Sequence, residues 1–174
     1  MSETIKVLIS KEEVEKRIIE LGEQISKDYA GDEIIIIPIL KGAAFFGCEL
    51  AKNITVPVTI DFMATSSYGS STSSTGDIKI KKDLDLSVEN KHVLIVEDII
   101  DSGNTLSFLE ELFATRNAKS VRKCALLDKP ERREVEVSMD YIGFSIPNEF
   151  VVGYGLDYAQ KYRNLPYIGV VELD

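Results

Sequence analysis

The chain has 174 residues and a formal net charge of -9, with 44% hydrophobic and 28% charged residues. This length suffices for one sizeable core, so we expect one domain over residues 1–174. The acidic charge argues against a nucleic-acid binder, and no apolar run approaches the roughly 20 residues that span a bilayer. Because the N-terminal segment lacks a signal core and the only cysteines are Cys48 and Cys124, we expect a cytoplasmic protein.

Hydrophobic periodicity predicts alternating helices and strands. A capping-box pattern at Ser10 and Glu13 opens the first helix, and Gly31 ends it. Strands are predicted at Ile34–Ile37, Val58–Met63, Val93–Val96 and Val121–Leu127, and further helices at Gly42–Asn53 and Leu106–Arg116. This order predicts an α/β fold with a doubly wound, mainly parallel sheet flanked by helices, in which ligands bind at the carboxyl ends of strands.

The segment Val93–Leu106, VLIVEDIIDSGNTL, carries the strongest chemical signal. Its apolar run predicts a buried strand, after which come the acids Glu97, Asp98 and Asp101. Ser102–Thr105 then supplies hydroxyls and a flexible turn ahead of a helix, whose N-terminal N–H groups can bind an anion without a lysine. The acids suit a polyhydroxyl or metal-bound ligand, and the turn suits a phosphate.

Other nucleotide and metal motifs are missing from the sequence. No Gly-Lys-Ser/Thr follows the turn, so it is no Walker A loop, and it lacks the glycine spacing of a dinucleotide fingerprint. The lone His92 excludes a histidine-based metal site, which leaves oxygen ligands and favours magnesium. A lone acidic turn more often only caps and solubilises a helix start, but a Glu-Asp pair followed by Asp-Ser-Gly favours a ligand site.

The acidic segment resembles the phosphoribosyl-pyrophosphate signature of type I phosphoribosyltransferases, in the hypoxanthine (hypoxanthine-guanine) branch. Four further segments occur in the family's order: LKGA at 40–43, SSYGSSTSSTGDI at 66–78, LLDKP at 126–130 and FVVGYGLDY at 150–158. The resemblance implies the family's fold, with a small hood formed by terminal segments and a flexible active-site loop. That loop corresponds to residues 65–77, whose composition predicts a mobile loop and equally fits a surface loop without a role.

The resemblance implies transfer of the ribose 5-phosphate group from phosphoribosyl pyrophosphate to hypoxanthine or guanine, with release of pyrophosphate. It places Glu97 and Asp98 on the ribose hydroxyls, with Mg²⁺ bridging those hydroxyls and the pyrophosphate. Asp101 resembles the family's general base, placed beside the imidazole nitrogen of the purine. The cradle for the 5-phosphate corresponds to Asp101, Ser102, Gly103, Asn104 and Thr105.

The pyrophosphate contacts are also implied by the resemblance. Lys41 and Gly42 match a loop in which the family has a cis peptide bond before the lysine, although an ordinary helix start is an equal interpretation of the residues alone. Ser67 and Tyr68 match a pair in the mobile loop, and Arg163 matches an arginine that contacts pyrophosphate.

The remaining matches concern the purine and the metal. Lys129 matches a lysine that donates to the six-position oxo group, where a solvated lysine before a turn is the plainer interpretation. Phe150 would stack on the purine and the Val151 backbone would contact its pyrimidine edge, although FVV also fits a core strand. Asp157 matches a second magnesium-binding acid, while an acid in a turn is commonly only a turn former.

Three alternatives stay open. A regulator could keep the phosphoribosyl-pyrophosphate motif without catalysis and bind nucleic acid or a protein, but the acidic charge argues against it. An enzyme of the same class could act on xanthine, adenine or a pyrimidine, although Lys129 and Phe150 favour an oxo-purine. A metal- or phosphate-binding module without transfer activity is the third. We expect small-molecule partners, no nucleic acid, no membrane, and a homodimer or homotetramer as in the family.

Overall fold

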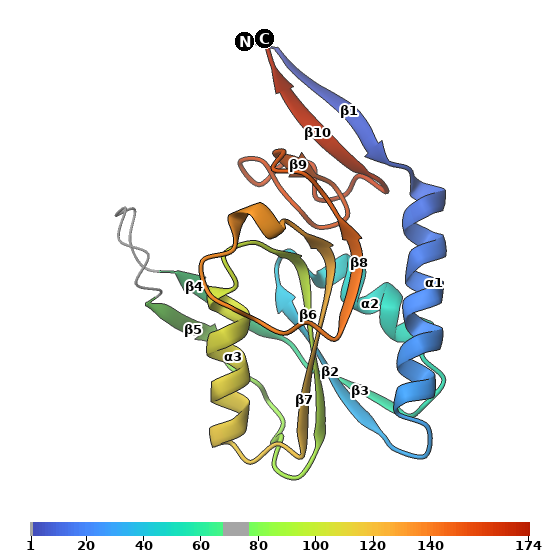
Figure 1. The fold of residues 1–174 in the computed structure, drawn as a ribbon, viewed down its shortest axis with the longest axis vertical. Helices are drawn as coiled ribbons and strands as arrows, with labels where there is room; N and C mark the ends of the chain where they lie inside the picture. The colour runs from blue at the N-terminus through green and yellow to red at the C-terminus, as the bar shows by residue number, and fades with distance from the viewer. Residues whose placement is uncertain (1, 68–76) are drawn as a thin grey trace.

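The structure is a computed structural model that describes residues 2–67 and 77–174, and it contains a large sheet with helices on both faces and a small sheet at one end (Figure 1). The elements in chain order are β1 Glu3–Ile9, α1 Lys11–Asp28, β2 Ile34–Leu40, α2 Ala44–Lys52, β3 Val58–Ile60, β4 Met63–Ser67, β5 Ile78–Lys82, β6 His92–Ile100, α3 Asn104–Thr115, β7 Ser120–Asp128, a short 3-10 helix Pro130–Arg132, β8 Tyr141–Ser145, β9 Val151–Val152 and β10 Ile168–Leu173.

The large sheet runs in the order β5-β4-β2-β6-β7-β8, with β3 also paired to β2. Its described pairs are parallel except for β4 with β5. The chain leaves β2 toward β3 and β4 but leaves β6 toward β7, so the neighbours β2 and β6 form a topological switch point. A crevice for ligands forms at the carboxyl ends of strands at such a point. The predicted doubly wound, mainly parallel α/β sheet is confirmed.

Helices α1 and α2 pack on one face of the large sheet and α3 packs on the other (Figure 1). Alternate residues of β6 serve the two faces: Leu94 and Val96 belong to the core under α1 and α2, and Val93 and Ile95 belong to the core under α3. A strand that is buried on both faces needs such a continuous apolar run. No helix among the described residues is long and apolar enough to cross a membrane.

The start of α1 confirms the predicted capping box. The Ser10 hydroxyl accepts the Glu13 N–H at 3.2 Å, and the Glu13 carboxylate accepts the Ser10 N–H at 2.9 Å. These two bonds satisfy backbone donors that a helix start otherwise leaves without partners.

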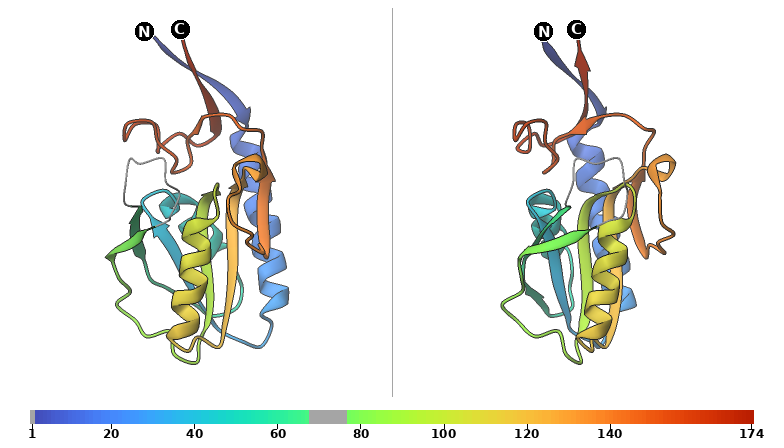
Figure 2. Two further views of the ribbon diagram at one scale, coloured as in Figure 1. Left: turned by 60° about the vertical axis from the view of Figure 1, so that its left-hand side comes forward. Right: turned by 90° about the vertical axis from the view of Figure 1, so that its left-hand side faces the viewer.

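The small sheet has the order β1-β10-β9 and brings the two termini together (Figure 2). Both of its pairings are antiparallel. The segment 153–167 between β9 and β10 lies over the end of the large sheet where the parallel strands finish (Figures 1 and 2). This arrangement confirms the expected hood, for which we keep that name: β1, β9, β10 and the segment 153–167.

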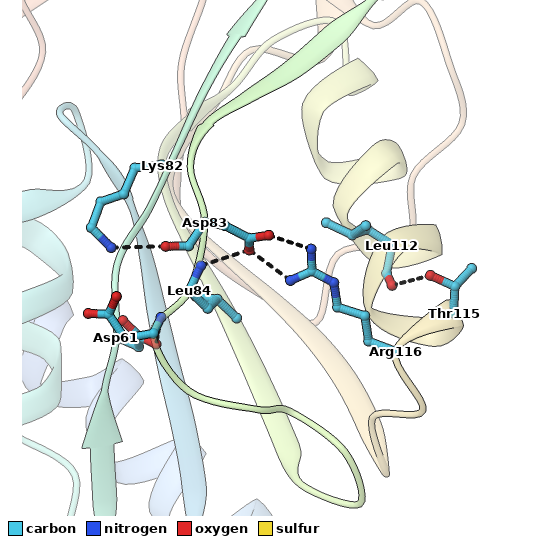
Figure 3. Close-up of polar contacts among 8 residues, drawn as sticks. Asp61, Lys82, Asp83, Leu84, Leu112, Thr115 and Arg116 are labelled. Atoms are coloured by element: carbon cyan, nitrogen blue, oxygen red, sulfur yellow. Dashed lines mark hydrogen bonds and ion pairs between the residues drawn. The ribbon is translucent and has the colours of Figure 1, made fainter.

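The predicted strand Val58–Met63 is wrong, because the chain breaks into β3 and β4 at Asp61. The Asp61 carboxylate is buried and accepts three backbone N–H groups at 2.9 Å, from Phe62, Asp85 and Leu86. Nearby, the Asp83 carboxylate holds the Arg116 guanidinium at the end of α3 (Figure 3). Of the predicted loop at 65–77, residues 65–67 belong to β4 and residues 68–76 lie outside the described residues.

The predicted strand Val93–Val96 is too short, because β6 continues to Ile100. Pairing with β7 persists to its end, through Ile99 opposite Leu127 and Ile100 opposite Asp128. Glu97 and Asp98 therefore lie within β6, whereas the sequence predicted that they follow the end of the strand.

Candidate active site

The loop that follows β2 meets the end of β6 at the switch point of the large sheet. A Cβ atom on Gly42 would lie 2.0 Å from Oδ2 of Asp98, so only glycine leaves room for this carboxylate. The peptide bond between Leu40 and Lys41 is cis, as the resemblance implied. The hood closes over the same point, since a Cβ atom on Gly155 would lie 1.9 Å from the Gly42 carbonyl oxygen.

The adjacent carboxyl groups of Glu97 and Asp98 lie in a weakly solvated part of this crevice. Burial, together with the neighbouring Asp98 charge, raises the pKa of Glu97 well above its ordinary value. Burial also raises the pKa of Asp98, although the Ile99 N–H, which donates to it at 2.7 Å, and the positive charge of Arg163 oppose that rise. Two such groups favour a ligand that brings hydroxyl donors or a cation.

The turn after β6 forms a pocket of about 130 Å³ at the N-terminus of α3. Its lining residues are Glu97, Ile99, Ile100, Asp101, Ser102, Gly103, Thr105 and Leu106. Gly103, with φ of +88°, turns the chain into the helix, and Ser102 accepts the Asn104 N–H on its hydroxyl at 3.2 Å. A helix N-terminus lined by hydroxyls suits a phosphate, as the turn predicted.

Asp101 stands at the start of this turn with one oxygen unused. Its Oδ1 atom is buried and has no hydrogen-bond partner among the described residues, and the Arg132 Nε atom lies 3.8 Å away. Buried polar atoms normally have a partner, so an orphaned carboxylate oxygen marks a place where a ligand can donate a proton.

Arg133 fastens this turn to the end of β7, and its role was not predicted. Its guanidinium donates to the Asp128 carboxylate at 2.6 Å and to the Asp101 carbonyl at 3.0 Å. The Ser102 carbonyl accepts two further N–H groups from the same segment, those of Glu134 and Val135, at 2.9 and 3.1 Å. The only signal for this role in the sequence is that Arg133 follows shortly after the predicted strand that ends near Asp128.

The predicted purine contacts lie at the ends of β7 and β9. The Lys129 N–H donates to the Ile100 carbonyl at 3.0 Å, which joins the ends of β7 and β6. Phe150 is 53% exposed and meets the Tyr158 ring edge-on at a centroid distance of 5.6 Å, whereas Val151 is buried. Phe150 and Val151 therefore face opposite ways at the start of β9, which is compatible with both the ring contact and the core strand considered for this segment.

The hood supplies Asp157 and Arg163. The Arg163 guanidinium donates to the Gly155 carbonyl at 2.6 Å and lies 3.4 Å from the Asp157 carboxylate. The positive charge of Arg163 also lowers the pKa of Asp98, so Arg163 lies near the acidic end of β6. Ser67 ends β4 as an exposed residue, and Tyr68 lies outside the described residues.

The acids fit a magnesium ion only if a substrate completes its coordination. Within the described residues, no three His, Cys, Asp or Glu side chains are grouped so that they could hold a metal. Protein-bound Mg²⁺ usually keeps several waters and takes one or two carboxylates together with substrate phosphates. Glu97 lines the pocket at the turn and Asp98 is its neighbour in β6, so these two carboxylates meet that requirement, whereas Asp157 lies on the hood beside Arg163.

The doubly wound sheet, with an acid pair and a helix N-terminal pocket at its switch point, fits a phosphoribosyltransferase. The chain belongs to the phosphoribosyl transferase domain family, whose model matches residues 8–159.

Its relatives identify the branch of that family. It is 53% identical to the hypoxanthine phosphoribosyltransferase of Salmonella typhimurium, over 99% of this chain and 98% of that protein. It is 56% identical to the hypoxanthine phosphoribosyltransferase of Buchnera aphidicola subsp. Schizaphis graminum, over 98% of each. A solved structure of a hypoxanthine-guanine phosphoribosyltransferase from Bacillus anthracis superposes with a TM-score of 0.92 at 46% identity, over 98% of this chain and 100% of that one. The resemblance seen in the motifs is confirmed.

Proposed function

We propose that this protein transfers the 5-phosphoribosyl group from phosphoribosyl pyrophosphate to hypoxanthine and guanine, which gives IMP or GMP and pyrophosphate. The observation that carries this proposal is the meeting of the Lys41–Gly42 loop with Glu97, Asp98 and the phosphate turn at one crevice. Each charged part of phosphoribosyl pyrophosphate then has a group at this crevice that can bind it. The names of relatives that share about half of the residues support the same reaction.

The sugar carbon gains positive charge as pyrophosphate leaves, so the chain has to hold the sugar and the leaving group in line. The Glu97 and Asp98 carboxylates accept hydrogen bonds from the ribose hydroxyls. The backbone N–H groups and side-chain hydroxyls of residues 101–105 hold the 5-phosphate. Lys41 and Arg163 donate to the pyrophosphate, as we also propose for Ser67 at the end of β4. Glu97, Asp98 and Asp157 would hold Mg²⁺, which would supply positive charge to offset the negative charge of the pyrophosphate.

The purine lies between the ends of β7 and β9 in this proposal. Asp101, whose buried Oδ1 atom has no hydrogen-bond partner among the described residues, takes the proton of the purine's imidazole nitrogen as the ring bonds to the sugar carbon. Lys129 donates to the six-position oxo group, which selects against a six-position amino group. The exposed ring of Phe150 stacks on the purine, and the Val151 backbone contacts its pyrimidine edge.

We infer that residues 1–174 act as one catalytic domain and assemble as a homodimer or homotetramer. We place the enzyme in the cytoplasm, where Cys48 and Cys124 would stay reduced, as the free thiols they are in the structure.

A steady-state assay tests the reaction. Hypoxanthine, guanine, xanthine and adenine are each supplied with phosphoribosyl pyrophosphate and Mg²⁺ while pyrophosphate release is followed. We expect turnover of hypoxanthine and guanine, little turnover of adenine, and no turnover without Mg²⁺. Activity on none of the bases would overturn the proposal, and salt-sensitive RNA binding in its place would favour a regulator.

A further inference from the structure

Gln160 reaches from the hood to the loop that follows β2. Its side-chain oxygen Oε1 accepts a hydrogen bond from the Lys41 ammonium at 3.3 Å and another from the Arg163 guanidinium at 3.2 Å. Two cations from separate parts of the fold therefore converge on one neutral oxygen. Gln160 lies outside the family motifs and outside the residues proposed to contact the substrates.

The backbone fixes the position from which Gln160 reaches across. Its φ is +65°, in the left-handed region that non-glycine residues seldom adopt, and the preceding Ala159 has φ of +51°. The Gln160 N–H donates to Oδ2 of Asp157 at 2.9 Å, which holds this turn. The course of the hood loop therefore decides where the carboxamide lies.

The neighbouring contacts hold both cations at the same place. Arg163 donates to the Gly155 carbonyl at 2.6 Å. Gly155 in turn packs so closely on Gly42 that a Cβ atom there would lie 1.9 Å from the Gly42 oxygen. The arginine on the hood and the lysine beside Gly42 are thereby brought within reach of one acceptor.

We propose that Gln160 is a positioning residue that gathers Lys41 and Arg163 at one point, from which both donate to oxygens of the diphosphate leaving group. This inference rests on the proposed function. The carboxamide oxygen can accept from both cations without cancelling their charge, and an anion can then replace it as their acceptor.

The charge of Gln160 matters as much as its geometry. One carboxylate, that of Asp157, already lies 3.4 Å from Arg163. A second carboxylate at position 160 would pair with both cations and compete with the anionic ligand for them. Because the Gln160 carboxamide is neutral, the net charge of the group formed by Lys41, Arg163 and Asp157 stays positive.

Three variants separate geometry from charge. Gln160→Met keeps the length of the side chain and removes the acceptor, whereas Gln160→Glu keeps an acceptor and adds a negative charge. Gln24→Met, at an exposed position of α1, is the matched control. Calorimetry measures the Kd of inorganic pyrophosphate with Mg²⁺ present, and steady-state kinetics gives kcat and the KM of each substrate.

We expect Gln160→Met to weaken pyrophosphate binding and to raise the KM of phosphoribosyl pyrophosphate by about three- to tenfold, the effect of one exposed hydrogen-bonding group between charges. Its kcat and its KM for hypoxanthine should stay within about twofold of the wild-type values, which a general structural defect would not allow. Gln160→Glu should weaken pyrophosphate binding further, and its deficit should shrink as salt screens the added charge. Gln24→Met should match the wild type.

Two results would overturn the inference. One is wild-type pyrophosphate affinity in Gln160→Met or Gln160→Glu, even in an enzyme that turns over hypoxanthine normally. The other is a wild-type protein that binds no pyrophosphate. Failure of the proposed function would look different, because the wild type would then lack turnover while the pyrophosphate calorimetry still decided the role of Gln160.

Discussion

Gly42 and Asp98 approach each other so closely that one added methyl group cannot fit between them: a Cβ atom on Gly42 would lie 2.0 Å from Oδ2 of Asp98. Gly42 follows β2 and Asp98 belongs to β6, so this contact closes the crevice at the switch point. The glycine is needed for space, since its φ lies outside the left-handed region.

Gly42→Ala should therefore displace either the Asp98 carboxylate or the loop that carries Lys41. Because a shift of about 1 Å in a catalytic group can cost about 100-fold in rate, we expect kcat/KM for phosphoribosyl pyrophosphate to fall by about that factor. Steady-state kinetics measures the loss, and thermal unfolding checks that the variant is folded. A folded Gly42→Ala enzyme with wild-type kcat/KM would show that the crowded contact relaxes without consequence.

Asp101→Asn should remove the proposed general base while keeping the shape of the side chain. Turnover should fall by about 10²–10⁴-fold, the usual contribution of a positioned base, while the KM of phosphoribosyl pyrophosphate stays nearly unchanged. Asp85→Asn, at an exposed position away from the pocket, serves as the control. A loss below about tenfold for Asp101→Asn would remove the residue from this role.

Arg133→Met should lower the free energy of unfolding, because the largely buried Asp128 carboxylate loses its charged partner. We expect a loss of about 1–3 kcal/mol in urea denaturation, the range for a buried polar group left without its bond. Turnover should also fall, since Arg133 holds the Asp101 carbonyl.

The double variant Arg133→Met with Asp128→Asn provides the control for this pair. Removing the unpaired Asp128 charge should restore part of the lost stability. The effects of the two substitutions on the free energy of unfolding should therefore not be additive. Strictly additive effects in this cycle would mean that the ion pair contributes nothing of its own.

Local patterns predicted much of the fold because local chemistry decides it. The capping box of α1 involves residues three apart, and the apolar run of β6 identifies a strand buried on both faces. The end of β6 is decided by pairing with β7, which holds Glu97 and Asp98 in a strand despite their low strand propensity. The break at Asp61 likewise depends on N–H groups 24 and 25 positions away.

The candidate site shows the same division. The acid pair and the phosphate turn are contiguous, so their chemistry could be read from the sequence, and the resemblance supplied proposed roles for Lys129 and Asp157. Arg133 and Gln160 lie outside those motifs, and their contacts join positions 32 and 119 residues apart. For Arg133 the only local signal is the acid at the preceding strand end, and the residues beside Gln160 contain none, because the sheet and the hood bring these segments together.

Asp83 and Arg116 form a two-pronged ion pair that joins the segment after β5 to the end of α3 (Figure 3). The two guanidinium nitrogens donate to the two carboxylate oxygens at 2.8 and 2.7 Å. The hydrogen bonds from Arg116, and to a smaller extent the Leu84 N–H, lower the pKa of Asp83 in the folded protein. The folded state therefore favours the ionised carboxylate.

Asp83→Asn should accordingly cost stability in a pH-dependent way. A lowered folded pKa contributes stability above the unfolded value, about 3.9 for aspartate, and that contribution is lost as the pH falls through the folded pKa. Since the pair is partly exposed, we expect a deficit of only about 0.5–1 kcal/mol at pH 7. Urea denaturation from pH 7 down to the acid limit of folding should show the deficit shrinking below the unfolded pKa. A deficit that is constant over this range would assign the stabilisation to packing and remove the ion pair as its cause.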